Sequence, residues 1–578
     1  MSRLREHYQR IVERERGTLL KEWNGRRRVA LVYPNRYRLG MGNLGVHVCY
    51  RIVNARDDFL CERAFLPEPS ELAEHRRTDT PLLTLESQRP VRDFDVLMFS
   101  VSFEPDYVGL ARCLELAGIP LRAADRDARH PLVVLGGIGP TINPEPVADL
   151  VDLVGLGEAE PLLPPLLDLV AGADLADRDG LLRAAARIPG WYATQLYDVA
   201  YADDGVRHHP RGGAPERVMR RYVEGAWEAV APVIVSPEIT FAEHYDVEVS
   251  RSCLWGCRFC ASGFVTRPYR ELGPDEVARV IQAGALVRKR IGVVGTDVSD
   301  HRKLDGIAAL VRGAGAEVSF PSLRVEALAS ERGPFARTLA GGTAPETFTV
   351  APEAATERLR RVVNKKITDA EILRAVERGA SAGARKFKFY MLVGIPTETW
   401  EDVQAIPRLA RAARDVLHRV QPMGKLTLSV NPVIPKPWTP WQWIGLADVA
   451  YLKQAYAFLH AELDREPGLD VSGESPVAAR WQTLLARGDR RVTPAVLTAA
   501  ACDGNWRQAL RGFEDEPRYT HRTYPIDERL AWDFIDHSFV KGVLADEYRK
   551  SLNAIYSPPY DPVNKARPEI VPTPWVNG

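Results

Sequence analysis

The chain has 578 residues, of which 45% are hydrophobic and 26% are charged, as in an ordinary globular protein. This length exceeds what one hydrophobic core supports and predicts about three or four domains. The 76 basic and 76 acidic residues cancel, which argues against a general nucleic-acid binder, because such proteins usually carry a basic excess. No apolar run approaches the roughly 18 residues that span a bilayer, and the charged start has no secretory pattern. Seven cysteines, four of them isolated, do not indicate a disulfide framework, so we expect a cytoplasmic protein.

The first part of the chain predicts an α/β domain. Residues 1–25 are predicted to form one helix, because apolar residues recur there at helical spacing. Residues 26–175 then alternate helical segments with five apolar runs that predict buried strands, at residues 29–33, 59–65, 95–100, 131–137 and 150–157. This alternation predicts a parallel, doubly wound, flavodoxin-like sheet, whose ligands sit at the carboxyl ends of the strands. The loops expected there are rich in glycine: "RLGMGNLG", "GGIGPTINP" and "GLGEAEP".

A second α/β domain follows a linker that we place at residues 176–238. Residues 239–447 predict six further strands, at residues 245–250, 291–296, 317–323, 347–351, 386–394 and 426–432, with helical segments between them. Six β/α units predict an open, partial TIM-type (β/α)6 barrel with its active face at the strand carboxyl ends. Residues 448–578 predict a mainly helical C-terminal domain that ends in a Pro-rich tail.

Three cysteines are placed together on the loop after the first barrel strand. The segment "RSCLWGCRFCASG" at residues 251–263 contains Cys253, Cys257 and Cys260. A structural zinc site needs a fourth ligand, and neither Cys nor His follows at zinc-finger spacing. A disulfide would leave one thiol unpaired. Three thiolates instead suit an iron–sulfur cluster that keeps one iron open for a substrate or cofactor.

This cysteine pattern after the first strand of a six-unit barrel resembles the radical S-adenosylmethionine (SAM) superfamily. The resemblance implies that the three cysteines hold a [4Fe–4S] cluster, whose open iron chelates the amino and carboxylate groups of SAM. It also implies SAM contacts at Phe259, Gly295, Thr296, Asp297, Ser322, Arg324, Glu353 and Gly394. The Gly-Gly-Glu-like turn of the family is matched only approximately by "VGTDVSD". A capping or turn role is the alternative at each of these positions.

The front domain resembles the cobalamin-binding module that precedes the barrel in many radical SAM proteins. The resemblance rests on "YPNRYRLGMGNLG", "SVSFEPD" and "GGIGPTINPEPVADLVDLVGLGEAE", and on their order. It implies cobalamin contacts at Asn43, Leu44, Gly45, Ser100, Ser102, Gly136, Gly137, Gly157 and Glu158. The D-x-H-x-x-G signature of an axial histidine is missing, and we interpret His47 as a structural histidine. Members of this group often bind cobalamin without a protein ligand, and a flavodoxin-like sheet with another ligand is the alternative.

The resemblance extends over about residues 27–550, to an uncharacterised subgroup of cobalamin-type radical SAM proteins. It implies that an external reductant of the flavodoxin or ferredoxin type reduces the cluster, which cleaves SAM to a 5′-deoxyadenosyl radical. That radical abstracts hydrogen from an unactivated carbon of a small molecule or peptide, and methylcobalamin donates a methyl group. The segment "RSCL" departs from the subgroup, where Gly and Pro are more usual, and the tail has no cysteine for a second cluster.

Three other functions stay open at this point. The first is a cobalamin-dependent radical SAM enzyme that catalyses a cyclisation or rearrangement. The second is an RNA-modifying methylthiotransferase-like enzyme, which we disfavour because Cys49, Cys61 and Cys113 lack the usual arrangement for a second cluster. The third is a cobalamin-binding sensor with a degenerate barrel, which the intact cysteine motif disfavours. Trp438, Trp441 and Trp443 are expected to pack between the barrel and the C-terminal domain.

Overall fold

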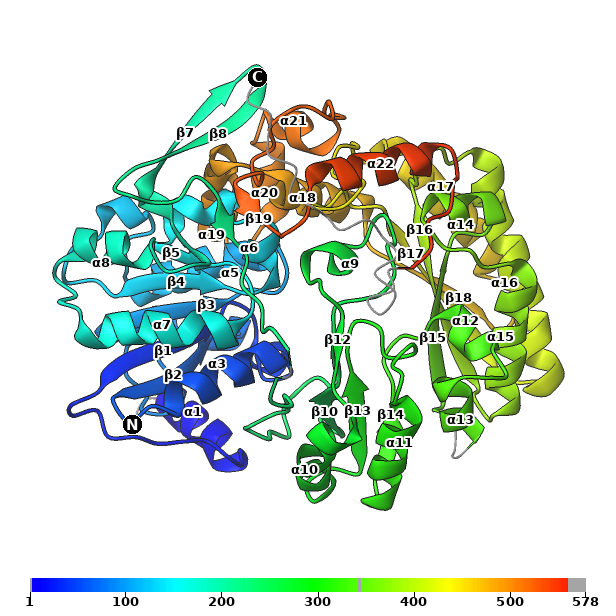
Figure 1. The fold of residues 1–578 in the computed structure, drawn as a ribbon, viewed down its shortest axis with the longest axis horizontal. Helices are drawn as coiled ribbons and strands as arrows, with labels where there is room; N and C mark the ends of the chain where they lie inside the picture. Colours follow the sequence, from blue (N-terminus) through cyan, green and yellow to red (C-terminus); the bar gives the residue numbers. More distant parts are fainter. Residues whose placement is uncertain (1–2, 226, 341–344, 560–578) are drawn as a thin grey trace.

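The chain folds into a front α/β domain, an open barrel and a C-terminal helical domain (Figure 1). The computed structural model describes residues 3–225, 227–340 and 345–559. In Figure 1 the front sheet lies at the left, the barrel strands lie at the centre and right, and the C-terminal helices run along the top. The Pro-rich tail lies outside the described residues from position 560 onward. Within the described part, every helix is too short or too polar to cross a membrane.

The front sheet has the strand order β2-β1-β3-β4-β5-β6 and is parallel except for β6 at its edge. Its strands are β1 (Arg27–Tyr33), β2 (Phe59–Phe65), β3 (Val96–Ser100), β4 (Leu132–Gly136), β5 (Leu153–Gly155) and β6 (Trp191–Ala193). The first five are the predicted strands, and the order 2-1-3-4-5 is the flavodoxin-like order, in which the winding reverses between β1 and β3. The sixth strand lies in the segment that was predicted as a linker.

Helices cover both faces of this sheet, because alternate side chains of its strands point to opposite layers. On β1, Val29 and Leu31 face the core formed with α3 and α7, whereas Ala30 and Val32 face the core formed with α5 and the C-terminal domain. The helices are α3 (Leu44–Asn54), α4 (Pro69–Thr78), α5 (Asp106–Ala117), α6 (Ile138–Ile142), α7 (Ala159–Gly172) and α8 (Arg178–Ala185). The predicted doubly wound domain is therefore confirmed.

The N-terminal helix is shorter than predicted. The sequence suggested one helix over residues 1–25, but α1 (Arg3–Arg14) ends at Arg14. The backbone of Gly17 has a φ of 98°, which a helix does not allow, and Arg16 forms an antiparallel bridge with Val235 instead. The prediction of a long helix was wrong because the chain pairs with a segment more than 200 residues away.

The barrel consists of two parallel sheets with the orders β10-β13-β14 and β15-β16-β17-β18. Its strands are β10 (His244–Glu248), β13 (Arg290–Val294), β14 (Glu317–Ser319), β15 (Thr347–Glu353), β16 (Lys386–Val393), β17 (Lys425–Pro432) and β18 (Leu469–Ser472). A parallel bridge between Leu323 and Val350 connects the two sheets. The first six strands match the predicted ones, and β18 extends the sheet by a strand that was not predicted. The barrel helices are α10 (Pro274–Ala285), α11 (Leu304–Gly313), α12 (Val325–Ala329), α13 (Pro334–Ala340), α14 (Glu357–Val362), α15 (Asp369–Ser381), α16 (Trp400–Val420) and α17 (Val449–Leu463).

The C-terminal domain is helical and touches both other domains. Its helices are α18 (Pro476–Arg487), α19 (Thr493–Ala501), α20 (Trp506–Arg511), α21 (Glu516–Thr520) and α22 (Lys541–Leu552). Toward the front domain, α19 packs on α5, and the buried Glu145 lies 3.3 Å from Arg490 Nε. Toward the barrel, Trp441 donates from Nε1 to Ser551 Oγ of α22 at 3.2 Å. Trp438, Trp441 and Trp443 are all buried, as predicted.

Candidate radical SAM site and interdomain cavity

The loop that carries the three cysteines begins at a short antiparallel ladder. Strand β11 (Ser250–Arg251) pairs with β12 (Arg270–Glu271). The chain leaves the barrel after β11 and returns to it at β12. The backbone N–H of Cys260 donates to Cys257 O at 3.0 Å, and the N–H of Trp255 donates to Cys253 Sγ at 3.4 Å. These turns bring the three cysteines into one half-buried loop, residues 252–263, which we call the cluster loop.

Charged side chains from the strand ends lie around these thiols. Cys253 Sγ donates to Asp297 Oδ2 at 3.7 Å, and burial, followed by the neighbouring Asp300, raises the pKa of Asp297 to about 7. Burial raises the pKa of the Cys257 thiol, while the positive charges of Lys365 and Arg324 act in the opposite direction. Two cations therefore lie where deprotonated thiols would need compensation.

The three thiols of the cluster loop are not gathered around one point. Among the described residues, no group of three or more His, Cys, Asp or Glu side chains is arranged around one ion. In a cubane cluster each cysteine binds a different iron, so the thiols need to share a loop but need not converge on one point. The three cysteines and the two nearby cations meet that requirement.

Three residues predicted to contact SAM, Asp297, Arg324 and Phe259, contact the cluster loop or lie within it. The guanidinium of Arg324 lies 3.5 Å from the centre of the Trp255 ring and is ion-paired with Glu326. Its Nε makes no hydrogen bond but lies 3.6 Å from Asp300 Oδ2. Phe259 packs against Trp441, with a distance of 6.2 Å between the ring centres. Asp297 contacts Cys253 as described above.

The other predicted SAM residues occupy several environments. Gly295 and Thr296 line a cavity that is described below. Glu353 is buried and lies 2.9 Å from Lys365 Nζ, and the N–H of Gly394 donates to Glu398 at 2.8 Å. Ser322 is exposed. Glu353 and Gly394 thus already have protein partners that support the barrel mouth.

A cavity of about 460 Å³ lies between the front sheet and the barrel. The front domain contributes the ends of β3 and β4 and the starts of α3 and α7, next to the point where the winding reverses. The barrel contributes the ends of β10 and β13 and part of the cluster loop. Most residues predicted to bind cobalamin line this cavity: Leu44, Gly45, Ser100, Gly136, Gly137, Gly157 and Glu158. The other two, Asn43 and Ser102, are hydrogen-bonded to each other at 2.9 Å, and Asn43 caps α3.

The backbone and polar groups of the cavity leave room for a large ligand. A Cβ atom at Gly136 would have no neighbour within 4 Å, so the free space reaches the strand itself. At Gly137, where φ is 110°, a Cβ atom would lie 2.3 Å from Val101 O, so glycine is required there. The hydroxyls of Ser250 and Ser252 are buried without a hydrogen-bond partner and belong to the lining. These unpaired donors and the open glycine backbone fit a ligand that carries many amide groups.

No histidine is found among the described residues that line the cavity. His47 is buried on α3, and its Nε2 lies 3.0 Å from Met41 O, which fits the structural role that we predicted. Burial lowers the pKa of His47 to about 4, so its ring is neutral.

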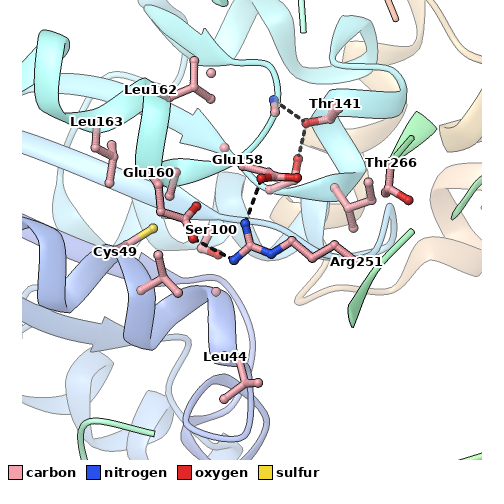
Figure 2. Close-up of a pocket in the computed structure, with 18 of the residues that line it drawn as sticks. Leu44, Cys49, Ser100, Thr141, Glu158, Glu160, Leu162, Leu163, Arg251 and Thr266 are labelled. Carbon is pink, nitrogen blue, oxygen red and sulfur yellow. Dashed lines mark hydrogen bonds and ion pairs between the residues drawn. The ribbon is translucent and has the colours of Figure 1, made fainter. Parts of the chain in front are cut away.

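An ion-pair network joins the two domains at the edge of the cavity (Figure 2). Arg251, two residues before the first cysteine, lies 2.8 Å from Glu158 and 2.7 Å from Glu160 of the front domain. Burial alone would raise the pKa of Glu158, but the hydrogen bond from Arg270 and the charge of Arg251 lower it overall. Both carboxylate oxygens of Glu158, which was predicted to bind cobalamin, are therefore paired with arginines of the barrel.

Sequence reasoning missed several residues of this site. Arg251 is part of the quoted cysteine segment and Lys365 is part of "RRVVNKK", but neither residue was assigned a role from the sequence. Cys49 lines the cavity on α3, while Cys61 and Cys113 are buried on β2 and α5. These three isolated cysteines thus lie on three separate elements of the front domain.

Comparison with protein families identifies the two α/β domains. Residues 45–193 match the model of radical SAM proteins, N-terminal, and residues 247–410 match the model of the radical SAM superfamily. The second match identifies a radical SAM domain over residues 247–410 of the chain. This match contains the three cysteines, four of the six predicted barrel strands and part of the first one.

Individual relatives have low identity. The chain is 25% identical over 471 residues to the uncharacterized protein MJ0966 of Methanocaldococcus jannaschii, which covers 80% of this chain and 89% of that protein. Among solved structures, it is similar to the cobalamin-dependent S-adenosylmethionine radical enzyme OxsB, at 10% identity and a TM-score of 0.48, over 91% of this chain and 79% of that one. It is also similar to the coproporphyrinogen III oxidase HemN of Escherichia coli, a radical SAM enzyme, at 16% identity and a TM-score of 0.29, over 38% and 52% of the two chains.

Proposed function

We propose that this radical SAM protein is a cobalamin-dependent enzyme that transfers a methyl group to an unactivated carbon of a small molecule or peptide. The observation that carries the proposal is that the interdomain cavity and the cluster site are formed by neighbouring residues. Ser252 and Thr296 line the interdomain cavity, and they immediately precede Cys253 and Asp297 of the cluster site. A ligand on the front sheet would therefore face the cluster loop.

The residues of the cluster site have complementary roles in this proposal. Cys253, Cys257 and Cys260 hold the cluster, and Lys365 offsets its negative charge. Arg324, which pairs with Glu326 and lies 3.6 Å from Asp300, would share its guanidinium with the carboxylate of SAM, and the carboxyl group of Asp297 would accept from the ammonium group of SAM. The cationic ammonium would favour the ionised form of Asp297, whose pKa lies near 7 without it.

The cavity residues orient the second cofactor and exclude water. The backbone at Gly136 and Gly137 and the hydroxyls of Ser250 and Ser252 would bind the amides of cobalamin. Apolar side chains such as Val48, Met98 and Leu162 keep this space dry. When bound, the cluster supplies the electron that cleaves SAM to methionine and a 5′-deoxyadenosyl radical, and cobalamin supplies the methyl group. An external one-electron reductant and a cytoplasmic location belong to the same proposal.

The test is anaerobic reconstitution with iron, sulfide and hydroxocobalamin, followed by addition of SAM and a strong reductant. The proposal predicts both 5′-deoxyadenosine and S-adenosylhomocysteine, with loss of 5′-deoxyadenosine in Cys257→Ala. Formation of 5′-deoxyadenosine alone would keep the radical enzyme and exclude the methyl transfer. Neither product, with cobalamin still bound, would indicate a binding or sensing protein.

A further inference from the structure

We propose that the C-terminal helix α22 and the segment after it, Ile555–Ser557, position the cluster loop and so belong to the catalytic centre. We call Ile555–Ser557 the strap. This inference rests on the cluster of the proposed function. Figure 1 shows α22 running from the C-terminal domain toward the barrel. The contacts below connect it and the strap to each residue between the last two cysteines.

The first contact is made by Arg258, which follows Cys257 directly. Its side chain is completely buried and donates to the backbone oxygen of Ile555 at 2.6 Å. It also lies 3.1 Å from Glu547 Oε2 of α22 and donates to Arg361 O at 2.8 Å. A buried guanidinium is stable only with such partners, so Arg258 ties the backbone of the motif to α22, to the strap and to the end of α14.

The second contact is made by Asn364, which bridges the cluster loop and the strap. Its Nδ2 donates to Gly256 O at 3.0 Å, immediately before Cys257. Its Oδ1 accepts from the N–H of Ser557 at 2.8 Å, and Ser557 Oγ donates to Glu547 at 2.7 Å. The backbone of Asn364 has a φ of 67°, a conformation that is fixed by these contacts on both sides.

The third contact involves Phe259, the other residue between the last two cysteines. Its ring packs on Trp441, which in turn donates to Ser551 of α22. Both residues between Cys257 and Cys260 are therefore held through elements of the C-terminal region. Because the spacing of two thiols depends on the backbone between them, these contacts control how well the loop matches a cluster.

The strap also brings the side chain of Tyr556 close to Lys366. The ring centre of Tyr556 lies 5.8 Å from Lys366 Nζ, next to Lys365. Burial raises the pKa of Tyr556, and the charges that act on it include those of Arg324 and Cys257. The strap thus also contacts the chain next to Lys365, which lies close to the cluster loop.

Two truncations separate the strap from the rest of the tail. A chain that stops after Ala554 lacks the strap, whereas a chain that stops after Pro559 keeps it. Both are reconstituted anaerobically, and the rate of loss of the cluster absorbance to an iron chelator is measured next to the full chain. We expect loss to be about 10-fold to 100-fold faster without the strap, the usual effect of removing supporting groups around metal ligands, and unchanged after Pro559.

A point variant keeps the test informative if the shorter chain fails to fold. Asn364→Gly tolerates the positive φ but removes both bridging bonds, and it should accelerate cluster loss in the same way while the far-UV circular dichroism of the cluster-free protein stays that of the full chain. Asn553→Ala is the matched control, because Asn553 is exposed and bonds only within α22. Asn364→Asp, which keeps the bond from Ser557, should lie between the two.

Each outcome decides the inference. Cluster loss at the full-chain rate in both the Ala554 truncation and Asn364→Gly would overturn it. Equal acceleration in the two truncations would also overturn it, because residues 560–578 would then be responsible. A full chain that takes up no cluster at all would instead contradict the proposed function.

Discussion

Replacing Arg251 with Met should loosen the contact between the front domain and the barrel. Three carboxylates surround its guanidinium, at 2.8 Å for Glu158, 2.7 Å for Glu160 and 2.9 Å for Glu248. The four side chains are 11–22% exposed, which is intermediate between surface and fully buried ion pairs. Surface pairs contribute about 0–1 kcal/mol to stability, whereas loss of one partner of a buried pair costs about 3–5 kcal/mol. We expect the free energy of unfolding to fall by about 2–3 kcal/mol, because the three carboxylates would then repel one another and only Arg270 would be left beside Glu158.

The assay is urea unfolding followed by tryptophan fluorescence, with midpoints compared transition by transition because the chain has several domains. Arg290→Met is the matched control: Arg290 lies 2.9 Å from Glu317, but these side chains are 53% and 69% exposed. It should shift the midpoint little. Equal midpoints for the two variants would refute the idea that Arg251 holds the domains together. The double variant of Arg251→Met and Glu158→Gln should lose less stability than the sum of the losses of the two single variants, because both substitutions remove the same ion pair.

Two further predictions concern single side chains near the site. Ser252 has a φ of 71° and a buried hydroxyl without a partner, so Ser252→Gly should stabilise the cofactor-free protein by about 1 kcal/mol in urea unfolding; destabilisation would show that the hydroxyl has a partner. Burial raises the pKa of Glu398 to about 7 from an ordinary value of 4.5, so the folded protein holds a proton that the unfolded chain releases. Its stability should therefore fall as the pH rises from 4.5 to 7 and level off above 7, by up to about 3 kcal/mol relative to Glu398→Gln. Parallel pH profiles of the two proteins would contradict this.

The doubly wound sheet and the proximity of the three cysteines could be predicted because each has a local pattern. Short buried runs separated by helices determine a parallel sheet, and three cysteines within eight residues are close in any fold. The glycine loops could also be assigned to one edge, since the carboxyl ends of parallel strands meet there. Six of the seven residues predicted from those loops line one cavity for this reason.

Contacts between distant segments could not be predicted in this way. Arg258 reaches Glu547 across 289 positions, and Arg251 reaches Glu158 across 93, with no periodic signal that connects them. Strand β18 was missed because four residues, "LDVS", are too short for a recognisable pattern. The N-terminal helix was extended too far because the apolar spacing gave no sign that Arg16 pairs with Val235.

The central claim is that the interdomain cavity holds the methyl carrier while the cluster loop cleaves SAM. The most direct test is the yield of S-adenosylhomocysteine and 5′-deoxyadenosine in Gly136→Val, whose Cβ atom would have no protein neighbour within 4 Å. Gly172→Val is the control, because Gly172 ends α7 away from the cavity and also has open space around it. Our account predicts that Gly136→Val loses bound cobalamin and S-adenosylhomocysteine but still forms 5′-deoxyadenosine, and that the control forms both. Unchanged cobalamin binding and unchanged yields in Gly136→Val would contradict it.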